Sequence, residues 1–451
     1  MLEKGSLELL ASALETLEQG FAPLPAIPAP ASDDARLARV MNEVAVRLRD
    51  NYPYFHPQYA GQMLKPPHPI ARSAYALATW INPNNHALDG GRASSQMEKE
   101  AVAQIAAMFG WREHLGHLCG GGTMANLEAL WVAGQLQPGK RILASDQAHY
   151  THSRISSVLQ LPFTAVPTDN RGRMDTGALG KMLAAGDVGC VVATTGTTGA
   201  GSVDPLPEIL RLREKYGFRL HADAAYGGYF SLAENLAPEA RAFFDLIGKA
   251  DSIVIDPHKH GMQPYGCGCV LFRDAGVGAI YKHDSPYTYF TSSDLHLGEI
   301  SLECSRPGAA AVALWATMQL LPLVRGGEFA LMLEDCRAAA LAMHGRLTQD
   351  PRWLVPFAPE LDIVVWAPRA SSASTISAHS QRIFDAAAKL GLHLALVRLP
   401  VRFFSSQPAP FEPDLNTVLC LRSVLMKPEH LAWMPRLWDI LSRAADEAGK
   451  R

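Results

Sequence analysis

The chain has 451 residues, of which 48% are hydrophobic and 19% are charged, and its formal net charge at pH 7 is −3. This length and apolar content predict two or three structural units around a large buried core. The balanced charge argues against a nucleic-acid-binding protein, and no uninterrupted apolar run is long enough to span a bilayer.

The N-terminal part of the chain is expected to be helical. Leu7, Leu10, Leu14 and Leu17 recur at a spacing that places them on one helix face. Residues 21–30 contain four prolines and predict an extended linker, after which residues 34–49 return to a helical pattern. We therefore assign residues 1–70 to an N-terminal helical segment.

From about residue 70 the pattern changes to helices alternating with short β-branched strands. Strands are expected at residues 141–145, 189–193, 218–222 and 252–255. Such alternation is typical of an α/β fold, with a mostly parallel sheet covered by helices on both faces. Ligands bind to such sheets at the carboxyl ends of the strands. Residues 71–327 are predicted to form this large domain.

An alanine-rich run at residues 309–321 predicts a long helix near the end of the large domain. The remaining residues, 328–451, contain further helix and strand patterns and are expected to form a smaller α+β domain.

The seven cysteines are widely scattered, which indicates reduced thiols in place of a disulfide framework. Cys267 and Cys269 form a C-x-C pair, but they lie in the strand-like run 266–272, where alternation in a strand explains them better than metal binding. No metal site is predicted. The N-terminus has no basic-then-apolar leader, so we expect a cytoplasmic protein.

The sequence Asp256-Pro-His-Lys259 directly follows a predicted strand. A lysine behind a histidine at the end of an apolar strand is poorly placed for a surface lysine. It is well placed to form a Schiff base with an aldehyde cofactor, because partial burial and nearby positive charge favour the neutral amine. Lys259 is therefore the candidate attachment point.

Asp223 also stands at the end of a predicted strand, in His221-Ala-Asp-Ala-Ala-Tyr226. A buried carboxylate stabilises a protonated pyridine nitrogen, and each tenfold change in that protonation equilibrium corresponds to about 1.4 kcal/mol. An aspartate for the ring nitrogen and a lysine for the aldehyde are the contacts that pyridoxal 5'-phosphate requires. Alone, each residue could equally be a turn cap or a solvated lysine; together they favour the cofactor.

Three further segments could complete the site. Gly120-Gly-Gly-Thr123 opens a predicted helix, where backbone amides and the helix N-terminus attract a phosphate. His149 follows a strand and could stack on the cofactor ring, with His152 as its competitor. Thr198 lies in a loop rich in threonine and glycine, where it could bind cofactor or substrate or only stabilise a turn.

In this order, these residues resemble the group II pyridoxal-phosphate-dependent amino acid decarboxylases, which include the aromatic amino acid, histidine, glutamate and tyrosine decarboxylases. The resemblance extends over residues 56–428 and is most specific at His258-Lys259, at residues 223–226 and at Ala148-His149. It implies the aspartate-aminotransferase-like fold, a homodimer, and decarboxylation of an L-amino acid to its amine and carbon dioxide.

The resemblance also implies a role for each cofactor-binding residue. Lys259 would bind the aldehyde, Asp223 the ring nitrogen, and His149 and Ala225 the two ring faces. The phosphate would be surrounded by Gly121, Gly122, Thr123, Asp256 and His258. Several relatives have asparagine where this chain has Asp256. Because a carboxylate repels a phosphate, we expect Asp256 to act through its backbone or to pair with a basic neighbour.

The substrate contacts implied by the resemblance are Arg422 for the carboxylate and Gln62 near the entrance; a structural ion pair remains the alternative for Arg422. The segment 302–308 around Arg306 looks like bacterial tyrosine decarboxylases and favours an aromatic amino acid such as tyrosine. Gln62 and the polar stretch 82–86 would equally suit an acidic substrate.

Relatives use a tyrosine on a mobile loop to protonate the product carbon. The corresponding loop, residues 284–294, offers Tyr287 and Tyr289, of which Tyr289 is the candidate; His296 and His258 are alternatives. An aminotransferase or a carbon–carbon or carbon–sulfur lyase on the same fold remains an alternative, since fold alone does not select the reaction. A pyridoxal-phosphate-binding protein without turnover is the third hypothesis.

Overall fold

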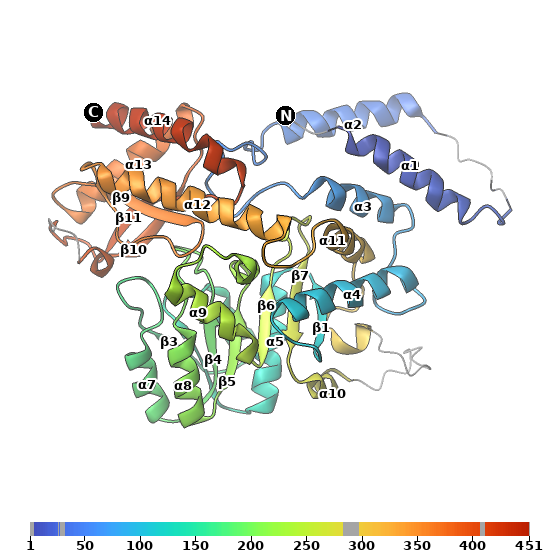
Figure 1. Ribbon diagram of the computed structural model, residues 1–451, viewed down its shortest axis with the longest axis horizontal. Coiled ribbons are helices and arrows are strands. Elements are labelled where there is room, and N and C mark those ends of the chain that lie inside the picture. Colours follow the sequence, from blue (N-terminus) through green and yellow to red (C-terminus); the bar gives the residue numbers. More distant parts are fainter. Residues whose placement is uncertain (1–3, 26, 28–31, 283–296, 406–410, 451) are drawn as a thin grey trace.

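The computed structural model describes residues 4–25, 27, 32–282, 297–405 and 411–450. Within them the chain forms two sheets with helices around both (Figure 1). The strands of the larger sheet come from the first two thirds of the chain and those of the smaller sheet from the last third.

The described chain begins with α1 (Ser6–Gln19), α2 (Asp34–Leu48) and α3 (Pro69–Thr79). The two predicted N-terminal helices are thus confirmed. Asp33 caps α2 by accepting a hydrogen bond from the backbone N–H of Arg36. α1 packs against α3, whereas neither α1 nor α2 has a buried residue.

The larger sheet has seven strands in the order β1-β7-β6-β5-β4-β2-β3. Strands β2 to β6 are parallel to one another, and β7 runs antiparallel to β1 and β6. Their bounds are β1 Leu115–Cys119, β2 Arg141–Ser145, β3 Phe163–Val166, β4 Val188–Thr194, β5 Arg219–Asp223, β6 Ser252–Ile255 and β7 Gly268–Phe272. This confirms the α/β fold, the mostly parallel sheet and each predicted strand to within two residues.

Helices cover both faces of this sheet because its strand residues alternate between two sets of core contacts. Leu143 and Val191 join the cluster formed with α4, α7, α8 and α9, whereas Ile142 and Val192 join the cluster formed with α5 and α6. The helices are α4 Arg92–Met108, α5 Gly122–Leu136, α6 Thr151–Val158, α7 Thr176–Ala184, α8 Leu206–Tyr216, α9 Pro238–Leu246 and the short α10 Gly278–Tyr281. Cys269 is a buried free thiol within β7, and Cys267 is buried just before it.

The rest of the chain carries α11 (Gly308–Leu320), as the alanine-rich run predicts, and a four-stranded antiparallel sheet in the order β10-β11-β9-β8. The four strands and the three helices that follow α11 are α12 Glu328–Gln349, β8 Trp353–Leu354, β9 Ile363–Pro368, α13 Ala373–Lys389, β10 Ala395–Pro400, β11 Thr417–Val424 and α14 Glu429–Gly449. The boundaries at residues 70 and 327 stay predictions.

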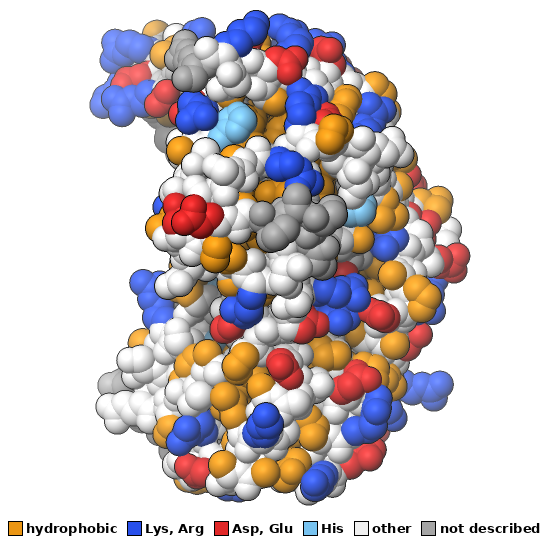
Figure 2. All heavy atoms as spheres, turned by 90° about the vertical axis from the view of Figure 1, so that its left-hand side faces the viewer, with side chains coloured by type: hydrophobic (Ala, Val, Ile, Leu, Met, Phe, Trp, Pro, Cys, Tyr) orange, Lys and Arg blue, Asp and Glu red, His pale blue; other side chains and the backbone are white. Residues whose placement is uncertain are grey.

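Acidic, basic and apolar side chains are interspersed over much of the face shown in Figure 2. None of the helices in the described ranges is both long and apolar enough to cross a membrane. The cytoplasmic location stays a prediction.

Candidate active site

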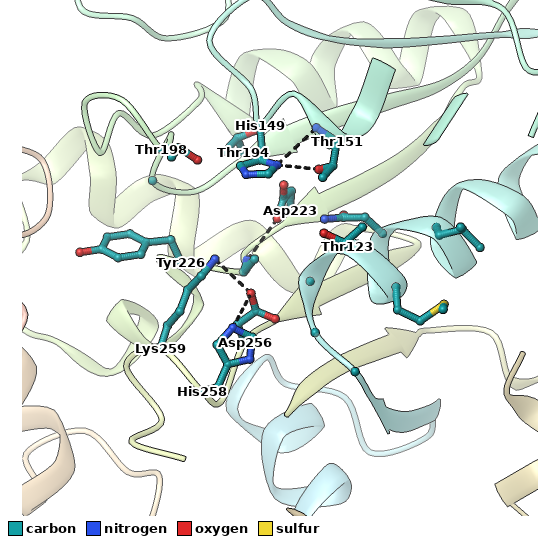
Figure 3. A pocket seen from close by; sticks show the side chains of 18 of the residues that line it. Thr123, His149, Thr151, Thr194, Thr198, Asp223, Tyr226, Asp256, His258 and Lys259 are labelled. Carbon is teal, nitrogen blue, oxygen red and sulfur yellow. Dashed lines mark hydrogen bonds and ion pairs between the residues drawn. The ribbon is translucent and has the colours of Figure 1, made fainter. Parts of the chain in front are cut away.

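A cavity of about 550 Å³ lies at the carboxyl ends of β4, β5 and β6 (Figure 3). Thr194 and Asp223 are the last residues of β4 and β5, and Asp256 directly follows β6. All ten residues predicted to bind the cofactor line it: Gly121, Gly122, Thr123, His149, Thr198, Asp223, Ala225, Asp256, His258 and Lys259. The structure thus brings together side chains that are up to 138 positions apart, between Gly121 and Lys259.

Asp223 is buried and is held by two hydrogen bonds. Its Oδ2 lies 2.8 Å from His152 Nε2, and its Oδ1 accepts from the backbone N–H of Ala225 at 3.2 Å. Burial alone would raise the pKa of Asp223, but the hydrogen bond from His152 and the charges of His152, His221 and Lys259 hold it well below its usual range. The surroundings of Asp223 therefore favour the charged form of this carboxyl in the cavity.

His152 contacts Asp223 and does not line the cavity in place of His149. It is fully buried at the start of α6, and among the described residues its Nδ1 has no hydrogen-bond partner. The stacking competitor considered from the sequence is thus a positioning residue for the carboxylate.

His149 is half-buried at the cavity, where its Nδ1 lies 2.7 Å from Thr151 Oγ1. This contact fixes the orientation of the ring. Burial lowers the pKa of His149, and the opposing charge of Asp223 does not outweigh that effect. A neutral imidazole with a fixed orientation suits stacking on an aromatic ring.

Lys259 projects into the same hollow from the turn that follows β6. Its Nζ lies 3.0 Å from Asp256 Oδ2, and its side chain is 21% exposed, so the amine remains accessible from the cavity. His258 donates from Nδ1 to the Cys267 carbonyl at 2.8 Å, and its Nε2 lies 3.6 Å from Asp256 Oδ2. Asp256 therefore pairs with basic neighbours, as expected from the sequence.

The glycine turn before α5 forms the opposite wall. Gly121 has a φ of 144°, which favours glycine, and a Cβ on Gly268 would stand 2.5 Å from the Gly121 backbone. Glu303, which was not predicted from the sequence as a site residue, accepts a hydrogen bond from the Gly120 N–H at 2.9 Å. Thr123 in the first turn of α5 is exposed to the cavity.

Two tyrosines without a sequence-based assignment also line the cavity. The Tyr226 hydroxyl donates to Asp362 Oδ1 at 2.6 Å, and Asp362 Oδ2 lies 2.8 Å from His260 Nε2. The Tyr265 ring packs on His258 with centroids 4.8 Å apart, and burial raises the pKa of Tyr265 to about 12. Tyr226 ends the Asp-Ala-Ala-Tyr motif, so its position was a usable signal; Tyr265 follows six residues after Lys259 without one.

Arg422 and Gln62 form a pair beside Tyr226. Arg422 Nη1 donates to Gln62 Oε1 at 3.3 Å, and Arg422 is only 3% exposed. Its Nε and Nη2 find no partner within the described residues, so an ion pair of the kind considered from the sequence is not seen there. Burial lowers the pKa of Arg422, against the opposing effects of Tyr226, Asp362 and Tyr59.

Tyr287, Tyr289 and His296 fall outside the described residues. Arg306 is buried in a structural ion pair, with Nη1 2.6 Å from Glu98 Oε1, and holds its segment to α4 and β1. The segment around it nonetheless reaches the cavity through Glu303.

The residues present fit pyridoxal 5'-phosphate. A buried carboxylate is available for a pyridinium, an accessible lysine for an aldehyde, a fixed imidazole for a ring face and the start of a 15-residue helix for a phosphate. Three of these four features come from residues 149–259.

Residues 131–367, more than half of the chain, match the model of the pyridoxal-dependent decarboxylase conserved domain. The L-tyrosine decarboxylase of Enterococcus faecium is 30% identical over 64% of this chain and 64% of its own length. The chain thus spans less than two thirds of that relative. The probable L-tyrosine/L-aspartate decarboxylase of Methanothermobacter thermautotrophicus is 29% identical over 68% of this chain and 82% of its own.

Solved structures share the fold. Mouse CSAD matches with a TM-score of 0.78 at 19% identity, over 98% of this chain and 92% of its own. Oryza sativa TDC, determined with PLP and tryptamine, matches with a TM-score of 0.78 at 17% identity, over 99% of both chains. With the family match extending over His149, Asp223 and Lys259, the chain belongs to the family of pyridoxal-dependent decarboxylases.

Proposed function

We propose that the protein decarboxylates an L-amino acid to its amine and carbon dioxide. The observation that carries the proposal is the meeting of Lys259 and the charged Asp223 at one cavity, in a chain of the pyridoxal-dependent decarboxylase family. When bound, pyridoxal 5'-phosphate supplies the electron sink that accepts the electron pair of the broken carbon–carbon bond.

The protein's own residues would bind and orient the cofactor and the substrate, and they would exclude water. Lys259 would hold the aldehyde of the cofactor. Asp223, held by His152, would keep a proton on the ring nitrogen. His149 would orient the ring from one side, with Ala225 on the other. The phosphate would be surrounded by Gly121, Gly122, Thr123, Asp256 and His258, and Thr198 would bind the cofactor or the substrate. For the final protonation, Tyr289 stays the candidate, with Tyr287, His296 and His258 as alternatives.

Arg422 is proposed to bind the substrate carboxylate. A buried guanidinium with two unpartnered nitrogens carries donors that a planar carboxylate can satisfy, and Gln62 orients it through Nη1. We expect Arg422→Gln to raise KM by about tenfold to a hundredfold, the cost of one buried charge-assisted hydrogen-bond pair.

Steady-state kinetics with the cofactor saturating would measure this change. The control is Arg398→Gln, an exposed arginine on the neighbouring strand β10. An unchanged KM in Arg422→Gln, with a loss of thermal stability, would assign Arg422 a purely structural role.

Tyrosine is the first proposed substrate, because the Enterococcus faecium relative is an L-tyrosine decarboxylase and the 302–308 segment reaches the cavity. Aspartate is the second, because an L-aspartate decarboxylase of Thermococcus kodakarensis is 29% identical over 62% of this chain.

Amine formation from a panel of tyrosine, phenylalanine, tryptophan, aspartate and glutamate would decide between these substrates. We expect tyrosine to give the highest kcat/KM. A preference for aspartate over tyrosine would select the second candidate.

We further propose a homodimer, as the family resemblance implies. α2 carries an apolar stripe at intervals of three, four and seven residues, and within the described parts of the chain no residue of α2 is buried. The stripe consists of Leu37, Val40, Met41, Val44 and Leu48, of which Met41 is 66% exposed. Such a stripe on a globular protein marks an interaction surface.

The dimer is testable by analytical ultracentrifugation of the full chain. The double variant Met41→Glu with Val44→Glu is expected to shift the protein from dimer to monomer, because each glutamate would bury a charge in the interface. Arg39→Glu changes charge on the other side of α2 and should leave the dimer intact. A monomeric wild-type protein, or a double variant that stays dimeric, would contradict this assignment.

A further inference from the structure

Asp256 stands between the attachment lysine and the phosphate end of the cavity. It is 2% exposed, and its Oδ2 contacts Lys259 Nζ at 3.0 Å and His258 Nε2 at 3.6 Å. On its other side it touches the start of α5, because a Cβ built on Gly122 would stand 2.7 Å from Oδ2 and 3.1 Å from Oδ1. The carboxylate is thus packed against the turn whose amides attract an anion.

The second oxygen of the Asp256 carboxylate makes no hydrogen bond to the described residues. Asp256 Oδ1 is buried and has no hydrogen-bond partner within the described residues. An unpartnered buried carboxylate oxygen costs free energy and keeps its negative charge poorly screened by water. Lys259 provides the nearby positive charge, and the contacts of Lys259 and of the His258 ring are both made through Oδ2.

We propose that Asp256 limits the affinity of the site for the phosphate group of the cofactor. A cofactor held through its aldehyde would engage Lys259, which would leave Asp256 with less positive charge beside a phosphate at the α5 turn. Like charges at close range in a buried site repel strongly. Asp256 therefore opposes the attraction that the helix N-terminus and the glycine amides supply.

This inference deepens the proposed function, since it rests on the same cofactor site, but it concerns binding and not the reaction. The test compares two aldehydes with the apoprotein: pyridoxal 5'-phosphate and pyridoxal, which lacks the phosphate. Both present the aldehyde to Lys259, so an effect on the lysine changes both affinities, whereas an effect on the phosphate changes only one. Dissociation constants come from absorbance titration.

For Asp256→Asn we expect pyridoxal 5'-phosphate to bind at least about tenfold more tightly, because a neutral amide of the same shape removes the repulsion. Pyridoxal affinity should change by less than about threefold, since no phosphate is present. Asp256→Ser removes the same charge with a smaller side chain and should show the same selectivity, which guards against a folding defect in one variant.

Glu113→Gln is the control. Glu113 is exposed and does not line the cavity, so water screens its charge and we expect little change for either aldehyde. An equal gain for both aldehydes would show that Asp256 acts through Lys259 alone, and an unchanged or weaker affinity for pyridoxal 5'-phosphate would also overturn the proposal. A wild-type protein that binds neither aldehyde would contradict the cofactor site itself, and with it the proposed function.

Discussion

Lys259→Ala is expected to abolish both the covalent attachment of the cofactor and turnover. Lys259 is the lysine that lines the cavity among the described residues, and its amine is accessible there. Loss of a residue that reacts covalently costs at least about a thousandfold in kcat. Borohydride reduction followed by mass spectrometry should detect a cofactor adduct on the wild-type protein and none on the variant.

The control for this change is Lys249→Ala. Lys249 is exposed immediately before β6, at the opposite end of that strand from the cavity. Its removal should leave both the adduct and the turnover in place. An adduct that persists in Lys259→Ala, or turnover within about tenfold of wild type, would show that another residue binds the aldehyde.

Asp223→Asn is expected to lower kcat by about a hundredfold to a thousandfold, because the loss of one preorganised electrostatic interaction typically lowers kcat by this factor. The amide keeps the size of the side chain and removes the charge that would hold a proton on the ring nitrogen. Attachment through Lys259 should persist, so the adduct measured by mass spectrometry remains. Asp223→Glu should recover part of the activity because it restores the charge.

The pH dependence follows from the same contacts. Because the pKa of Asp223 is depressed, its stabilising contribution is present above the unfolded pKa of about 3.9 and is lost only as pH falls below it. The pH–rate profile should therefore show no ionisation of this group between about pH 5 and 9.

The control for Asp223→Asn is Asp251→Asn, which changes a carboxylate just before β6 and away from the cavity. A similar loss of kcat in Asp251→Asn would make the effect of Asp223→Asn structural.

Much of the fold could be predicted because hydrophobic pattern and strand position are local signals. The buried strands β2, β4, β5 and β6 consist of short apolar runs that predict their bounds closely. The edge strands β1 and β3 were not predicted. Gly116 and His117 interrupt the apolar pattern of β1, and β3 has only four residues. The packing of β7 against β1 depends on contacts between residues far apart in the sequence, such as Leu115 and Phe272.

The site could be predicted where a side chain suited to the cofactor stands at the end of a strand or just after it, as Asp223 and Lys259 do. It was not predictable where a partner comes from a distant segment. His152 reaches Asp223 across 71 positions, and Glu303 reaches Gly120 across 183, and neither pattern has a local signature. Arg306 shows the opposite failure, because a segment that suggested substrate recognition uses its arginine for a buried ion pair with Glu98.

The most direct test of the proposed function is the stoichiometry of products from carboxyl-labelled tyrosine and aspartate with the purified holoprotein. We expect one labelled carbon dioxide for each amine formed, and no keto acid, with both products absent in Lys259→Ala. A keto acid without carbon dioxide would establish transamination in place of decarboxylation. No product from any amino acid, despite an intact cofactor adduct, would indicate a binding protein without turnover.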